Sequence, residues 1–201
     1  MSRTFFIVPI VEGHGEVQAI PVLLRRLHAN IIPAAGLTLN PPLRVKAGSL
    51  INDAGYFNKY VELAAQKARA RANSCVLIIL DCEDQCPGEL GPLLLKKANL
   101  LHSDVHFIVI LACREFETWF LAAAHSLQGH CGLPAGLEPP DNCAGIRNAK
   151  GWLSSRMPHP YIETIHQPSL TQVFAFQEAM AVDSFARTVR KLRQFFLAEP
   201  I

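Results

Sequence analysis

Three short apolar runs, each of which ends directly in acidic residues, constrain the fold of this chain most strongly. The runs cover residues 4–11, 75–80 and 105–112. Runs of this length that are almost entirely apolar are typical of strands covered on both faces, as in parallel sheets. All three are shorter than the roughly 20 apolar residues that a membrane-spanning helix needs. We therefore expect a buried sheet and no association with a membrane.

Segments with helical spacing of apolar residues alternate with these runs. They span residues 16–30, 54–72, 89–101 and 114–127, and a further amphipathic segment covers 184–197. Strands that alternate with helices imply right-handed crossovers, so we predict an α/β fold with a mostly parallel sheet and helices on both faces. A short strand is expected at 43–47, whereas the proline-rich segment 31–42 is expected to be irregular. Pro9 lies inside the first run and has no main-chain N–H. The strand should therefore lie near an edge of the sheet, or the sheet should need no N–H donor at position 9.

The composition suits one domain with a small appendage. Half of the 201 residues are hydrophobic and 18% are charged, which is enough apolar material for a core. We assign residues 1–128 to the α/β core and 129–201 to a loop and helical region packed on it. The net charge of +2 confines any basic surface to a local patch. The start of the chain lacks a cleavable signal pattern, and a core of this size needs no disulfides, so we expect a cytoplasmic protein with reduced cysteines.

Acidic side chains follow each of the three expected strands. Glu12 and Glu16 follow the first, Asp81, Glu83 and Asp84 the second, and Glu115 and Glu117 the third, just beyond Arg114. Open parallel sheets bind ligands beyond the carboxyl ends of their strands, so these carboxylates should converge on one crevice. At about 4 Å and an effective dielectric constant near 20, each like-charged pair costs roughly 4 kcal/mol.

A divalent cation would relieve this repulsion. Hard oxygen ligands suit Mg²⁺ or Mn²⁺ better than Zn²⁺. Asp81 and Glu83 are two residues apart, so they share one face if the backbone stays extended. The sequence therefore predicts a metal site that draws on the six acids Glu12, Asp81, Glu83, Asp84, Glu115 and Glu117.

Each acid also has an ordinary structural explanation. Glu16, Glu115 and Glu117 can occupy first helical turns, where carboxylates interact favourably with the helix dipole. Asp81 can cap the turn that follows it. Three acidic clusters that each follow an apolar run nevertheless favour a shared site.

Two shorter motifs are weaker guides to function. Gly13-His14-Gly15 lacks the third glycine of a dinucleotide-binding loop and the acid about 20 residues later. The two glycines suit a sharp turn beside Glu12, and His14 either contacts a phosphate or is an exposed loop histidine. Cys82 and Cys86 have the spacing of half a zinc site, but no second pair completes it, so we expect free thiols.

Several motifs together resemble a known family. Glu12-Gly13-His14-Gly15-Glu16 resembles the Glu-Gly-x-x-Glu motif that opens TOPRIM domains, particularly those of the overcoming-lysogenization-defect nucleases. Asp81-Cys82-Glu83 stands where such domains have Asp-x-Asp. The full pattern is similar to an uncharacterised bacterial TOPRIM-like family. The further segments that match are residues 114–122, Lys150 followed by Tyr161 and Gln167, and Ser184-Phe185.

The resemblance implies a TOPRIM-like (Rossmann-like) core with a helical C-terminal extension. Glu12 would act as general acid/base or metal ligand, with Glu16 and Lys150 in the catalytic set. Asp81 and Glu83 would hold metal, although Glu83 replaces the aspartate of the family. The resemblance also implies an AAA-type ATPase as a partner and a role in bacterial defence against phage.

Phosphodiester hydrolysis or transfer suits such a site. Two metals about 4 Å apart, or one metal with a general base, can activate water and stabilise the leaving oxygen. The candidate substrate contacts are His14, Arg114 and Arg187, although a solvated basic face on the final helix is the simpler explanation of the last of these. We expect a Mg²⁺- or Mn²⁺-dependent nuclease that acts on nucleic acid, DNA before RNA, as a monomer or homodimer.

Two other functions stay open. A non-catalytic partner or regulatory subunit of an AAA-type ATPase would keep the fold and part of the acidic cluster. A flavodoxin-like or Rossmann nucleotide binder would need a glycine-rich phosphate loop, for which the sequence gives only the weak Gly13-His14-Gly15 match.

Overall fold

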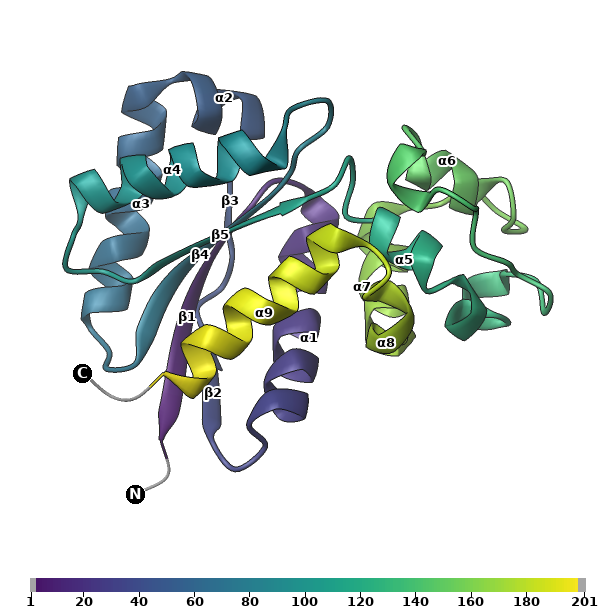
Figure 1. Ribbon diagram of the computed structural model, residues 1–201, viewed down its shortest axis with the longest axis horizontal. Coiled ribbons are helices and arrows are strands. Elements are labelled where there is room, and N and C mark those ends of the chain that lie inside the picture. Colours follow the sequence, from purple (N-terminus) through teal and green to yellow (C-terminus); the bar gives the residue numbers. More distant parts are fainter. Residues whose placement is uncertain (1–2, 199–201) are drawn as a thin grey trace.

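The protein, described by a computed structural model over residues 3–198, is built on a parallel sheet (Figure 1). The strands are β1 (Thr4–Val11), β2 (Gly36–Leu39), β3 (Leu43–Arg44), β4 (Ser74–Asp81) and β5 (Phe107–Ala112). The sheet order is β2–β1–β4–β5, every pair is parallel, and the short β3 also pairs with β1. The prediction that the three apolar runs form neighbouring parallel strands is confirmed, although the last strand begins at Phe107 rather than at residue 105.

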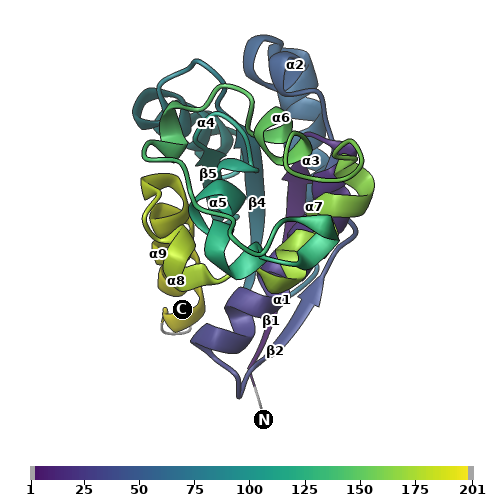
Figure 2. The ribbon, with the colours of Figure 1, turned by 90° about the vertical axis from the view of Figure 1, so that its right-hand side faces the viewer.

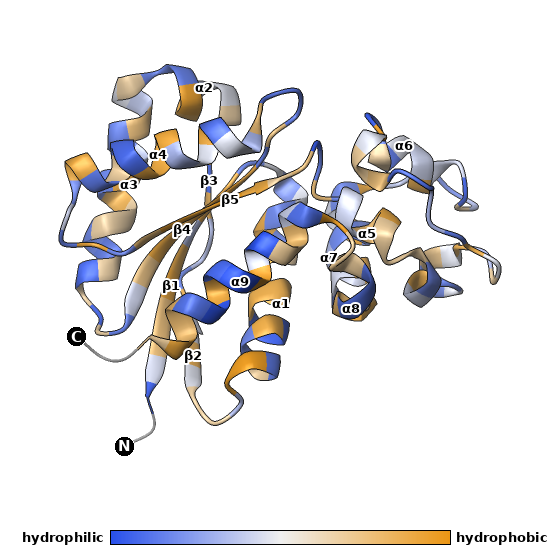
Figure 3. Ribbon diagram, in the orientation of Figure 1, coloured by the Kyte–Doolittle hydropathy of each residue, from blue (hydrophilic) through white to orange (hydrophobic). Residues whose placement is uncertain are grey.

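Helices cover both faces of the sheet, as the alternating pattern predicted. One face carries α1 (His14–Ile31) and α9 (Asp183–Leu197), and the other carries α2 (Ala47–Asn52), α3 (Ala54–Arg69) and α4 (Pro87–Leu101). Successive side chains of a strand point to opposite faces, so Ile7 and Leu77 belong to the first core and Val8 and Ile78 to the second. Figure 3 shows the strands as mostly hydrophobic and the visible side of α9 as largely hydrophilic.

The part of the chain between β5 and α9 gathers beyond the carboxyl ends of the strands (Figures 1 and 2). It contains α5 (Thr118–Ala122), α6 (Ala149–Ser154), α7 (Glu163–Val173) and α8 (Phe176–Ala179), with 3₁₀ turns at Ala124–Leu127, His130–Gly132 and Cys143–Gly145. Arg26 of α1 donates hydrogen bonds to the carbonyls of Thr171 and Phe174, at 2.7 and 2.9 Å. Trp119 Nε1 donates to Ser184 Oγ at 2.9 Å, which ties α5 to the start of α9. These contacts fix the C-terminal helices over the end of the sheet.

The position of Pro9 explains how a proline fits inside a central strand. β1 is not an edge strand, because β4 pairs with one side of it and β2 and β3 with the other. Ile7 O accepts a hydrogen bond from Asn40 N at the end of β2, and Val11 O accepts one from Val45 N after β3. Alternate residues of a strand direct their main-chain groups to the same side, so the main-chain nitrogen and carbonyl of Pro9 face the gap between β2 and β3. The missing N–H of Pro9 therefore costs no ladder hydrogen bond, which is the second of the two explanations expected from the sequence.

Three of the predicted segments need correction. Residues 31–42 are not wholly irregular, because β2 forms between the prolines of this segment without including one. The helix expected over 54–72 ends at Arg69, and a separate helix, α2, precedes it, with Asp53 Oδ1 capping α3 by accepting from Tyr56 N at 3.0 Å. The helix expected over 114–127 begins only at Thr118, because Arg114 has a φ of 64° that no α-helix tolerates. Within residues 3–198, no helix is both long and apolar enough to cross a membrane.

Gly15 permits the close packing of α1 against α7. A Cβ at this position would overlap Gln167 Oε1 and would lie 3.0 Å from the main-chain oxygen of Glu163. Because that second neighbour is backbone, the helices themselves would have to separate. Only glycine therefore fits here without strain.

We predict that Gly15→Ala destabilises the protein by about 1–3 kcal/mol, the usual cost of overpacking. Gly48→Ala is the matched control, since a Cβ at this exposed position of α2 has no atom within 4 Å. The control should be neutral or slightly stabilising, because alanine is the better helix former. Urea unfolding of the three proteins checks this, and equal free energies of unfolding for both variants would contradict the account.

Candidate metal and phosphate site

A cavity of about 540 Å³ lies at the carboxyl ends of β1, β4 and β5. The structure brings together there most of the candidate residues, namely Glu12, Glu16, Asp81, Glu83, Asp84, Arg114, Glu115 and Lys150. Glu117 is fully buried next to Lys150 and Tyr161. His14, the first residue of α1, and Arg187, on α9, are both exposed and do not line this cavity. Acids from three separate strand ends therefore share one space.

The loops after β4 and β5 hold two residues of the cavity in an unusual conformation. Glu83 and Arg114 have φ values of 46° and 64°, which non-glycine residues rarely adopt. Main-chain bonds beyond the strands hold this geometry: Cys82 N donates to Ala112 O at 2.9 Å and Glu83 N to Arg114 O at 3.1 Å. The expectation that Asp81 and Glu83 share an extended backbone is thus wrong. The left-handed turn nevertheless leaves both residues lining the cavity.

The thiol of Cys82 belongs to the same turn. Cys82 Sγ accepts from Arg114 N at 3.3 Å, and the side chain is buried. Cys82 and Cys86 are both unpaired, and Cys86 is exposed. The sulfur therefore helps to hold Arg114 in its left-handed conformation.

Glu12 is crowded by other carboxylates. Burial, and then the nearby Glu16 and Glu83, raise the pKa of Glu12 above its usual value. Its Oε2 atom is buried and has no hydrogen-bond partner among residues 3–198. The carboxylate of Glu16 in turn folds back over Gly13, where a Cβ would overlap it. Gly13 leaves room for this position of the Glu16 side chain, but its φ of −89° is one that any residue can adopt, so the turn itself does not require glycine.

Asp81 and Glu117 continue this crowding toward the interior. Burial, then Glu16 and Glu117, raise the pKa of Asp81 well above its usual value. Burial raises the pKa of Glu117 to about 7, although Lys150 acts in the opposite direction. Tyr161 OH and Gln167 Nε2 donate hydrogen bonds to Glu117 Oε1, at 2.9 and 3.2 Å. Glu117 is thus a buried acid whose pKa lies well above that of an exposed glutamate.

Cations from the C-terminal region neutralise part of the cluster. Lys150 Nζ lies 2.7 Å from Glu163 Oε1. Burial opposes the charge of Lys150, but Glu117 and Glu163 outweigh burial and raise its pKa. Arg114 and then Arg147 hold Asp84 and lower the pKa of that carboxyl, with Arg147 Nη1 3.0 Å from Asp84 Oδ2.

Glu115 has a structural role at the start of α6. Its two carboxylate oxygens accept hydrogen bonds from Ala149 N and Lys150 N, at 3.2 and 3.4 Å. Glu115 therefore does interact with the positive end of a helix dipole, as one explanation from the sequence expected. The helix is α6, however, and not the helix that directly follows β5. Glu115 and Asp84 already have partners, which leaves other acids to bind a cation.

Four acids that line the cavity, Glu12, Glu16, Asp81 and Glu83, form no direct ion pair within the described part of the chain. We call them the open carboxylates. Their donors are all hard oxygens, and Glu12 Oε2 lacks a partner, so they fit a Mg²⁺ or Mn²⁺ ion. Across residues 3–198, however, no three His, Cys, Asp or Glu side chains already stand in a metal-holding arrangement. Binding would therefore require the carboxylates to draw together around the ion.

Sequence reasoning missed three residues of the cavity. Arg147, Asn148 and Glu163 all line it. Arg147 and Asn148 end a long loop without regular spacing, and Glu163 begins a helix far along the chain, so no local pattern pointed to them. Only the folding of the C-terminal region over the sheet places them beside the acids.

Comparisons of the chain with known protein families, with curated proteins and with solved structures find no match. The geometry of the cavity is therefore the main basis for a functional proposal. The likeness to TOPRIM domains stays a prediction from the motifs.

We predict that Glu117→Gln stabilises the protein increasingly as pH rises from 5 to 8 in the presence of EDTA. The folded protein holds a proton on Glu117 up to about pH 7, whereas the unfolded chain loses it near the ordinary glutamate pKa of 4.5, so the native acid loses stability across this window. The gain from the amide should approach about 3 kcal/mol above pH 7.

Urea unfolding of both proteins at several pH values checks this prediction. Glu89→Gln is the matched control, since Glu89 is exposed on α4 outside the cavity. A stability difference between Glu117→Gln and the native protein that is constant with pH, or that shrinks as pH rises, would contradict the buried acid.

Proposed function

We propose that this protein is a divalent-metal-dependent phosphodiester hydrolase of the TOPRIM type. The observation that supports this most is the set of four open carboxylates in one cavity at the carboxyl end of a parallel sheet, with Lys150 beside them. Parallel α/β sheets bind ligands at this end. Burial first, and then the neighbouring carboxylates, raise the pKa values of Glu12 and Asp81, so holding both groups ionised in this cavity is costly without a cation.

Glu12, Asp81 and Glu83 would hold Mg²⁺ or Mn²⁺, with Glu16 behind them. Such an ion, when bound, supplies a Lewis acid for phosphate oxygens and for water. Glu12 has a raised pKa, which brings the carboxylate closer to the range in which a general base works at neutral pH. Lys150 is held at the same cavity by Glu163 and can offer positive charge to a phosphate.

The rim of the cavity suits an anionic substrate. Arg147 is exposed, and Arg114 and Arg147 both contact the exposed Asp84. A phosphate could replace Asp84 as their partner, because both guanidinium groups already meet at one carboxylate. We propose a nucleic acid as substrate, DNA before RNA, and an AAA-type ATPase as partner in phage defence. These last points rest on the motif resemblance alone.

A non-catalytic role as partner or regulatory subunit of such an ATPase is the second candidate. Its support is that Asp84, Glu115 and Glu163 have partners without metal, and that no metal-holding group is preformed within residues 3–198. Metal binding separates the two candidates. A regulatory subunit would keep its fold without needing a cation in the cavity.

We predict that the protein binds Mn²⁺ and cleaves a phosphodiester, and that Asp81→Asn and Glu12→Gln lose both properties. Each substitution keeps the volume but removes an anionic ligand, so turnover should fall by at least about 100-fold. Asp81→Asn should also raise the melting temperature in EDTA, because one source of repulsion is gone. A higher melting temperature together with lost activity would exclude misfolding as the cause.

Calorimetry with Mn²⁺ and cleavage assays on single- and double-stranded DNA and RNA, with and without EDTA, are the measurements. Glu89→Gln is again the control and should behave as the native protein. Cleavage that persists in both cavity variants would reveal a contaminating nuclease. Absence of both Mn²⁺ binding and cleavage would contradict the proposal and favour the regulatory role.

A further inference from the structure

β5 is the last strand of the sheet, and its free edge lies at the bottom of a groove. α4 packs on one side of this strand and α9 on the other, as Figure 1 shows. Two cavities, of about 1150 and 170 Å³, lie along the edge and share Val109 and Lys191 in their walls. Together they form one groove, which we call the β5 groove. It is separate from the acidic cavity, because none of the residues that line that cavity lines the groove.

The main-chain groups at this edge alternate in direction. His106 O and Ala112 O accept hydrogen bonds from Val76 N and Cys82 N, so the even-numbered residues of β5 face β4. The N–H and C=O groups of Phe107, Val109 and Leu111 therefore face the groove. Within residues 3–198, no strand pairs with this side of β5. Phe107, Val109 and Leu111 are themselves only 5, 2 and 7% exposed, so a further strand can pair with this edge only where the side chains of α4 and α9 along the groove move aside.

The groove is strongly cationic along its α9 wall. Arg187, Arg190 and Lys191 line it, whereas Asp104 is the one acid that residues 3–198 contribute to the lining, and it is paired with Arg69. Arg190 and Lys191 form no ion pair within the described residues. Burial, and then Arg187 and Arg190, lower the pKa of Lys191. Arg187 is already paired with Asp183, at 2.6 Å, so an incoming anion would relieve chiefly the repulsion between Arg190 and Lys191.

We propose that the β5 groove binds an extended acidic segment of a partner protein, which adds to the sheet as a strand beside β5. Main-chain hydrogen bonds to Phe107, Val109 and Leu111 would supply affinity, and carboxylates facing α9 would meet Arg190 and Lys191. A second copy of this chain fits poorly, because pairing two β5 edges would bring two cationic grooves together. This function is independent of the metal-dependent activity proposed for the acidic cavity.

Lys191 protects the edge while the groove is free. Its Nζ atom donates to Val109 O at 2.6 Å, which covers one of the outward acceptors. Lysines often guard exposed edges in this way against unwanted pairing. An acidic segment can displace this bond and give the ammonium group a carboxylate in exchange, whereas an uncharged segment cannot. The hydrogen bond from Lys191 to Val109 O therefore favours the binding of an acidic strand over an uncharged one.

The probe is a fluorescein-labelled peptide of about eight residues that alternates glutamate and valine, the length of an ordinary strand. Fluorescence anisotropy at low salt should show saturable binding. The same peptide N-methylated at every residue keeps its charges but lacks main-chain donors, and it should bind at least about tenfold more weakly. Peptide addition should also slow amide hydrogen exchange at Phe107, Val109 and Leu111.

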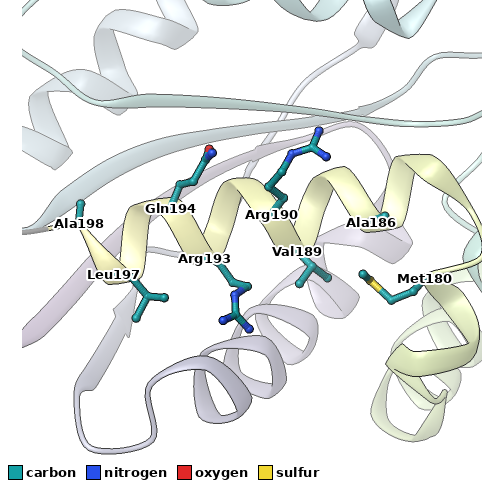
Figure 4. A pocket seen from close by; sticks show the side chains of 8 residues that line it. All are labelled: Met180, Ala186, Val189, Arg190, Arg193, Gln194, Leu197 and Ala198. Atoms are coloured by element: carbon teal, nitrogen blue, oxygen red, sulfur yellow. The ribbon is translucent and has the colours of Figure 1, made fainter.

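Arg190→Glu and Arg193→Glu are matched variants on the same helix. Both residues are exposed, but Arg190 lines the groove and Arg193 does not. Figure 4 shows their side chains projecting from opposite sides of α9. Arg190→Glu should weaken peptide binding about tenfold, and Arg193→Glu should change it less than about twofold.

Three outcomes would overturn the proposal. The first is no saturable binding of the glutamate–valine peptide at low salt. The second is equal binding of the N-methylated peptide, which would mean that charge alone acts. The third is that a labelled oligothymidylate binds with the same dependence on Arg190 while the peptide does not, which would make the groove a nucleic-acid surface.

Discussion

Repulsion among carboxylates at the carboxyl ends of β1, β4 and β5 is the constraint on which the arrangement of this protein depends. Burial, and then the proximity of Glu16, raise the pKa values of Glu12 and Asp81. Such crowding persists in a native structure only when the surroundings compensate it. Here Lys150, Arg114 and Arg147 supply part of the compensation, and a divalent cation would supply the remainder.

The C-terminal region is therefore part of the site as well as of the fold. The loop and helices after β5 bring Lys150 and Arg147 to the acids, and α7 brings Glu163. Gly15 allows α7 to approach α1, and Glu115 anchors the start of α6. The same region ends in α9, which covers one face of the sheet and walls the β5 groove. One segment thus completes both surfaces.

The sheet was predictable from the sequence because unbroken apolar runs have few alternatives to a buried parallel strand. The gathering of acids followed from the rule that parallel strands end on one side. What could not be predicted depends on long-range contacts: the short β2, the left-handed turns at Glu83 and Arg114, and the partners of Asp84. Arg187 illustrates what a sequence pattern cannot predict. Helical spacing placed Arg187 on the basic face of α9, but the groove that this face borders depends on the packing of α9 against the sheet.

A crystal structure of the protein soaked in Mn²⁺, with data collected at the manganese absorption edge, tests the central claim most directly. The account predicts an anomalous peak inside the acidic cavity, bonded to carboxylate oxygens of Glu12, Asp81 and Glu83 at distances of about 2.0–2.3 Å. It also predicts that the open carboxylates draw together around the ion. A cavity without a peak, with Glu12 and Asp81 unmoved at a saturating Mn²⁺ concentration, would contradict the claim.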